Sequence, residues 1–213
     1  MAGAVPQGRE AMDRTNGLLA LSLALALGLT GLAAASGAQE TNQKMTPEME
    51  AWIKAGQPGE HHRHLARLAG TWTAEVTTWM PGPEGVQEVK STGKMESKMI
   101  FDGRYLESHY QGTFMGQQFE GFGLDAYDNV SGKYVGIWID SMSTTMAIFR
   151  GECDGTGKVR TSYGRIKDPV TGRMKKQKAV TTIIDENTYT YEAYEYGKDG
   201  KEVKMMKIVF TRI

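Results

Sequence analysis

Residues 119–140, FEGFGLDAYDNVSGKYVGIWID, contain two extended segments on either side of a short polar turn. The turn, residues 128–132 (DNVSG), is made of residue types that adopt left-handed backbone or bond their own backbone through the side chain. The segment after it, residues 134–139 (YVGIWI), is apolar on both faces. Because so few residues separate the two segments, they must pair as neighbouring antiparallel strands.

Turn signals of the same kind recur along the chain after Gly70, and they predict ten strands joined by nine turns. The stretches between the turns are too short for the helices that connect parallel strands, so the strands must form an antiparallel meander. Few leucines follow residue 38, whereas β-branched and aromatic residues are abundant, as a sheet protein requires. The signals lie at residues 81–83, 102–103, 115–116, 128–132, 140–141, 154–157, 168–172, 185–187 and 199–200.

A meander of ten strands either keeps two open edges or curls until its first and last strands pair. Alternate residues of 72–78 share one face of the first strand, and alternate residues of 206–212 share one face of the last. We expect these segments to pair. The predicted fold is all-β, an antiparallel up-and-down barrel of about ten strands, lipocalin-like, preceded by short helices.

An apolar segment near the start of the chain predicts an export signal. Residues 17–35, GLLALSLALALGLTGLAAA, form an uncharged apolar run between Arg14 and the small residues 36–38 (SGA). This pattern is typical of a signal peptide, so we predict cleavage after Ala38 and export to the periplasm or the outside of the cell. The alternative is a retained anchor, because the run approaches the roughly 20 residues of a membrane span. After cleavage we expect no stable membrane insertion.

These boundaries divide the chain into three parts. Residues 1–38 are the predicted signal peptide, residues 39–59 a linker with a short helix, and residues 60–213 the barrel domain. Met1 and Met12 are both candidate start sites, and a start at Met12 would give a signal peptide with a more ordinary beginning.

Charge and cysteine content exclude several classes of function. The chain carries 25 Lys and Arg against 25 Asp and Glu among 213 residues, so it sets up no long-range field that would attract nucleic acid. We therefore expect no nucleic-acid partner. Cys153 is the single cysteine, which excludes an intramolecular disulfide and any Cys-rich zinc or iron-sulfur site. No cofactor is indicated.

The two ends of the barrel domain resemble a known superfamily. Gly70-Thr71-Trp72 follows a short helical turn, and Arg212 stands next to the last residue. The pattern resembles the lipocalin-like, or calycin, superfamily, in which Gly-x-Trp opens the barrel and a basic side chain of the final strand covers the tryptophan. The resemblance implies that Trp72 and Arg212 close one end, where an Arg guanidinium stacked on an indole is a favourable contact.

Longer segments resemble the bacterial domain-of-unknown-function family fifteen seventy-nine, in that family's order and over about residues 60–213. This resemblance implies an exported lipocalin-like barrel and brings no catalytic residue with it. The segments are residues 65–72 (LARLAGTW), 101–106 (FDGRYL), 119–123 (FEGFG) with 127–129 (YDN), 138–142 (WIDSM) and 168–172 (DPVTG).

The histidines are candidates for metal or haem. A helix would place His61 and His64 on one face, with His62 between them, but two imidazoles make no site without a third protein ligand. We therefore expect no metal and interpret the three histidines as a solvated helical face. His109 is the one histidine within the predicted strands, and a hydrogen-bonded residue of the barrel is favoured over a haem ligand.

Small barrels either fill their interior with side chains or hold one ligand. Our leading hypothesis is that the lumen binds a small, largely apolar molecule, with the loop of residues 140–145 (DSMSTT) near the opening. It requires a connected cavity of at least about 300 Å3. The residues expected to line it are Trp72, Val76, Tyr110, Phe122, Trp138, Asp140, Met142, Phe149 and Phe210.

Two other functions remain open. The first is an isomerase or lyase in which His109, Glu192 or a tyrosine moves a proton inside the lumen. The second is an interaction module with a packed core and an exposed apolar patch around Val135, Ile137 and Ile139. The sequence identifies no catalytic residue and does not decide the oligomeric state.

Overall fold

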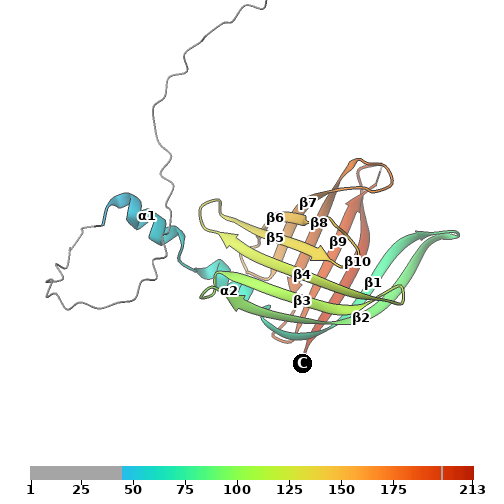
Figure 1. The fold of residues 1–213 in the computed structure, drawn as a ribbon, viewed down its shortest axis with the longest axis horizontal. Helices are drawn as coiled ribbons and strands as arrows, with labels where there is room; N and C mark the ends of the chain where they lie inside the picture. The colour runs from blue at the N-terminus through green and yellow to red at the C-terminus, as the bar shows by residue number, and fades with distance from the viewer. Residues whose placement is uncertain (1–44, 198) are drawn as a thin grey trace, which may run out of the picture. The chain divides into compact units, whose positions relative to one another are not determined.

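The computed structural model describes residues 45–197 and 199–213. Ten strands form a closed antiparallel barrel, in which each strand pairs with its neighbours along the chain and the first pairs with the last (Figure 1). The predicted ten-stranded up-and-down barrel is confirmed. The strands are β1 (Gly70–Gly82), β2 (Gly85–Ile100), β3 (Tyr105–Phe114), β4 (Gln117–Asp128), β5 (Lys133–Asp140), β6 (Ala147–Cys153), β7 (Val159–Lys167), β8 (Met174–Ile183), β9 (Thr188–Tyr196) and β10 (Glu202–Arg212).

The predicted signal peptide, residues 1–38, lies outside the described residues. Within residues 45–197 and 199–213, no helix has both the length and the apolar character needed to cross a membrane.

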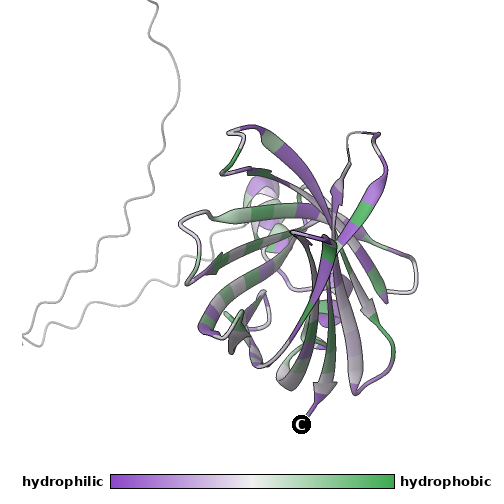
Figure 2. Cartoon of the chain, turned by 90° about the vertical axis from the view of Figure 1, so that its right-hand side faces the viewer, coloured by the Kyte–Doolittle hydropathy of each residue, from purple (hydrophilic) through white to green (hydrophobic). Residues whose placement is uncertain are grey.

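The barrel closes along the seam between β1 and β10. Trp72 lies opposite Arg212, Val76 opposite Ile208, and Thr78 opposite Met206. Every second residue of β1 from Trp72 to Thr78 is buried, because successive side chains of a strand point to opposite faces of the sheet. Hydrophobic and hydrophilic bands alternate along the strands for the same reason (Figure 2).

Two helices precede the barrel, α1 (Pro47–Ala55) and α2 (Glu60–Ala66). In α1 the Thr46 hydroxyl accepts a hydrogen bond from the Met49 amide at 3.3 Å and caps the first turn. None of the nine residues of α1 is buried. By contrast, α2 packs on β3 and β4, and Leu65 is 2 % exposed. The second helix therefore covers one end of the barrel.

The histidines of α2 attach this helix to the barrel, which corrects the expected solvated face. The Nδ1 atoms of His61 and His64 lie 3.0 Å and 3.3 Å from the Tyr134 hydroxyl of β5. The His61 ring also stacks on Tyr127, with 3.9 Å between ring centroids. In the described part of the chain, no group of three or more His, Cys, Asp or Glu side chains is arranged to hold a metal ion.

His62 is expected to make the stability of the fold depend on pH. Its Nδ1 accepts a hydrogen bond from the Gly59 amide at 2.9 Å, and burial, with smaller effects of His61 and Arg104, lowers the pKa of its imidazole below the usual 6.5. The folded state therefore favours neutral His62. As the pH falls below about 6.5, the unfolded chain takes up the proton more readily, and the free energy of unfolding decreases.

We expect His62→Gln to reduce this loss of stability, because glutamine keeps an acceptor for the helix N-terminus but carries no titrating group. Urea unfolding of both proteins between about pH 7 and about pH 5 measures the effect. An equal loss in both proteins would show that other groups cause the acid sensitivity.

Candidate functional site

The barrel encloses a cavity of about 660 Å3. Inward-facing side chains of all ten strands line it, and most of them are apolar or aromatic. The volume exceeds the expected minimum and lies within the range of small-molecule binding sites. A packed core, as the interaction-module alternative required, is therefore excluded.

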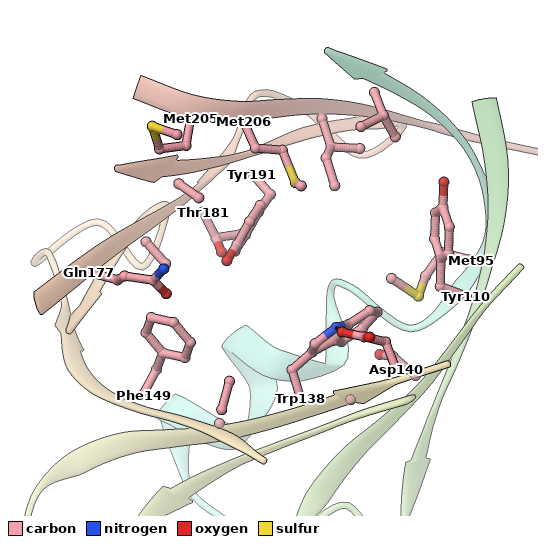
Figure 3. Close-up of a pocket in the computed structure, with 18 of the residues that line it drawn as sticks. Met95, Tyr110, Trp138, Asp140, Phe149, Gln177, Thr181, Tyr191, Met205 and Met206 are labelled. Atoms are coloured by element: carbon pink, nitrogen blue, oxygen red, sulfur yellow. Dashed lines mark hydrogen bonds between the residues drawn. The ribbon is translucent and has the colours of Figure 1, made fainter. Parts of the chain in front are cut away.

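Seven of the nine residues expected at the site line this cavity. Trp138 of β5 and Tyr191 of β9 point into the same space from different parts of the barrel (Figure 3). Trp72 and Phe122 do not line it. The seven are Val76, Tyr110, Trp138, Asp140, Met142, Phe149 and Phe210.

Trp72 belongs to the closed end of the barrel rather than to the cavity surface. It is 1 % exposed, and its indole N–H donates a hydrogen bond to the Leu68 carbonyl at 3.0 Å. Its ring packs edge-on against Tyr189, with 4.7 Å between centroids. The guanidinium of Arg212, a residue of β10, lies 3.9 Å from the centroid of the Trp72 indole. A side chain enclosed on all sides has no face left for a ligand.

Arg212 holds three parts of the closed end together. Its guanidinium donates hydrogen bonds to the carbonyls of Ala69 at 2.9 Å, Glu186 at 2.9 Å and Arg67 at 3.1 Å. Gly70 has a φ of 133°, and a Cβ at this position would overlap the guanidinium. A side chain at position 70 would therefore displace the guanidinium, and the structure places Arg212 where the resemblance implied.

Phe122 points to the outer face of the barrel, which corrects its expected role. It packs against His109, with 5.1 Å between ring centroids. The inward positions beside it are Gly121 and Gly123, and a Cβ built on Gly121 would overlap the Trp138 ring. Successive side chains of a strand point to opposite faces, so Phe122 lies outside between these two inward positions, and the indole fills the space at Gly121.

Trp138 is held in position at one side of the cavity. Its indole N–H donates a hydrogen bond to Asp140 Oδ2 at 3.1 Å (Figure 3), and the Met142 amide donates to Asp140 Oδ1 at 3.0 Å. Asp140 therefore fixes both the aromatic ring and the start of the loop after β5. Met142 is 55 % exposed while also lining the cavity, which places this loop at the opening.

The lumen also contains a charged pair that the sequence reasoning missed. Arg160 Nη1 of β7 lies 3.0 Å from Asp125 Oδ1 of β4, and both residues line the cavity. The Arg160 guanidinium lies 5.7 Å from the ring centroid of Tyr134, the tyrosine that contacts α2. The pair therefore lies toward the helix-covered end. Asp140 is the one other charged residue among the described residues that line the cavity.

Tyrosine hydroxyls add neutral polar groups to the lumen. Burial raises the pKa of Tyr191 to about 12, and burial also raises the pKa of Tyr134 and of Tyr189. All three hydroxyls therefore keep their protons at neutral pH and can donate hydrogen bonds. Such groups can orient a ligand but do not act as bases.

Two of the residues expected for proton transfer, His109 and Glu192, lie on the outer face, whereas tyrosines do line the lumen. His109 Nε2 lies 3.1 Å from Glu107 Oε1, and neither residue lines the cavity. Glu192 accepts a hydrogen bond from the Tyr194 hydroxyl at 2.8 Å and pairs with Lys204. His109 and Glu192 therefore do not reach the lumen, and of the groups named for an isomerase or lyase only tyrosine hydroxyls face it.

The outer surface of β4 to β6 is partly apolar. Ile139 is 40 % exposed and Ile148 is 41 % exposed, and Ile137 lies opposite Ile148 in the register. Of the residues expected in the apolar patch, Val135, Ile137 and Ile139, only Ile139 is exposed, and the core beneath these strands is hollow.

Comparisons with known structures find designed barrels. The chain is similar to a redesigned beta barrel, b11L5F_LGL, at 18% identity and a TM-score of 0.36, over 71% of this chain and 96% of that one. It is similar to the redesigned beta barrel mFAP1 bound to DFHBI at 17% identity and a TM-score of 0.37, over 70% and 99% of the chains. For EF1p2_mFAP2b bound to DFHBI the identity is 15% and the TM-score 0.34, over 72% and 100%.

No curated protein matches the chain at a significant level. A family model described as a protein of unknown function, DUF1579, matches residues 57–212. That range begins just before α2 and ends with the final strand, so it covers the whole barrel. The chain therefore belongs to the DUF1579 family.

Proposed function

We propose that this protein is an exported barrel that binds one small, largely apolar molecule in its lumen. The observation that carries the proposal is the connected cavity of about 660 Å3, lined mainly by apolar and aromatic side chains. Export is supported by the apolar run of residues 17–35 and the small residues after it.

The shape of the lumen favours a ligand that enters from the loop end. The opposite end is filled by buried side chains, including Leu65, Leu106 and Trp72, each at most 2 % exposed. Phe149 and Trp138 present ring surfaces to the cavity (Figure 3). Transfer of apolar surface from water onto these rings is the driving force for binding, at about 25 cal/mol per Å2.

A neutral fluorescent probe, N-phenyl-1-naphthylamine, tests the proposal, because its emission rises in apolar surroundings. We expect saturable binding by the purified protein. Phe149→Ala removes a ring from the cavity and is expected to weaken binding by about tenfold, which corresponds to about 1.4 kcal/mol of lost contact.

Phe122→Ala is the matched control, since it removes the same ring from the outer face of a nearby strand. We expect less than about a twofold change in affinity for this variant. Absence of saturable binding, or equal weakening by both substitutions, would contradict a luminal site.

A further inference from the structure

The charged pair in the lumen has N–H donors and carboxylate oxygens that form no hydrogen bond with any described residue. Arg160 Nη1 is fully buried and has no hydrogen-bond partner, because its contact with Asp125 has the distance but not the direction of a hydrogen bond. The other guanidinium nitrogens of Arg160 donate to no described residue either, and the side chain as a whole is 16 % exposed. An arginine has five N–H donors, and leaving them unpaired in an apolar interior is costly.

Asp125 faces the same space. Its side chain is 26 % exposed, and among the described residues no donor makes a hydrogen bond to it. A Cβ on Gly136, the opposing residue of β5, would lie 2.7 Å from Asp125 Oδ1, so glycine leaves room for the inward carboxylate. The pair therefore presents donors on one side and acceptors on the other to the cavity.

The net charge of the pair determines which ligand it suits. The charges of Arg160 and Asp125 neutralise each other. A ligand carboxylate that approached Arg160 would therefore be repelled by the nearby Asp125 carboxylate, and this repulsion is strong in a largely apolar lumen. A cation would meet Arg160 in the same way. An uncharged group that both accepts and donates hydrogen bonds avoids both repulsions. It also pairs with the donors of Arg160 and with the acceptors of Asp125.

We propose that the ligand ends in an uncharged polar head group, of the kind a primary carboxamide provides, and that Arg160 and Asp125 bind it. This inference rests on the luminal binding proposed above. The head-group oxygen accepts from the Arg160 guanidinium and its N–H donates to Asp125. The apolar tail lies along Phe149 and Trp138 toward the opening beside Met142.

Decanamide and decanoate test the proposal, because they share one chain and differ in head-group charge. Displacement of N-phenyl-1-naphthylamine gives their affinities at about pH 7.5, where decanoate is ionised. We expect the wild-type protein to bind decanamide about tenfold more tightly, as one charge-assisted hydrogen bond provides.

Variants of the pair make the test specific. Asp125→Asn leaves the Arg160 charge unbalanced, so we expect the preference to reverse in favour of decanoate. Arg160→Gln together with Asp125→Asn leaves no unpaired charge, and this double variant is expected to bind the fluorescent probe normally and to lose the preference. It also covers the case in which the single variant does not fold. Glu192→Gln, in the outer ion pair with Lys204, is the control and should change neither affinity.

The outcomes separate the two proposals. If the wild-type protein does not bind the fluorescent probe, luminal binding itself is wrong. If the probe binds but decanoate competes as well as decanamide, or neither competes, the head-group inference is overturned while luminal binding stands.

Discussion

Replacement of Arg212 by alanine is expected to lower the free energy of unfolding by about 3 kcal/mol. The substitution removes three hydrogen bonds to backbone carbonyls of two segments and the contact of the guanidinium with the buried Trp72 ring. The carbonyls of Ala69 and Arg67 precede β1, and that of Glu186 precedes β9. One side chain thus fastens three strands at the closed end, and urea unfolding measures its contribution.

Two further variants define the cause. Arg212→Lys keeps the charge but not the planar fork of donors, so we expect it to restore less than half of the lost stability. Lys207→Ala, on the outer face of the same strand, should cost less than about 0.5 kcal/mol. If alanine at Arg212 were as harmless as alanine at Lys207, the closed end would not depend on this guanidinium.

Replacement of Ala179 by tryptophan is expected to weaken probe binding by more than about a hundredfold, equivalent to about 2.8 kcal/mol. Ala179 lies between Ser162 and Ala193 in the register, and all three small residues line the cavity. This row keeps one side of the lumen open. An indole at its centre fills the space that a ligand needs, while it buries apolar surface and leaves the fold stable.

Val180→Trp provides the matched control, because the next residue of β8 has the opposite orientation and does not line the cavity. We expect it to leave probe binding within about twofold of the wild-type value. Circular dichroism and urea unfolding should show both variants folded. Normal binding by Ala179→Trp would place the probe outside the lumen.

The barrel was predictable from the sequence because its signals are local and repeated. Turn residues such as those at 128–132 define where each strand ends, and the short spacing leaves only antiparallel neighbours. Closure was predictable because the segments 72–78 and 206–212, each with one apolar face, would otherwise remain the two open edges of the meander. The cavity residues found in this way, such as Val76 and Phe149, follow the same alternation.

The errors concern one residue whose inward or outward orientation was misjudged and one charged pair that joins distant strands. Phe122 was expected inside, but the inward positions on either side of it are glycines, and Trp138 from the next strand occupies the space above them. Arg160 was missed because a charged residue in a strand normally faces water, and only Asp125, from a distant strand, makes an inward position acceptable. Such a pairing leaves no periodic signal in either segment.

The seam between β1 and β10 also has a consequence for the speed of folding. All the remaining strand pairings join neighbours in the chain, and each can form as an independent hairpin. The seam instead joins Trp72 to Arg212. Closing so long a loop costs conformational entropy, and this cost arises before the contacts of the seam contribute any stability. We therefore expect the rate-limiting barrier in refolding to lie at this last ring closure, after the local hairpins have formed.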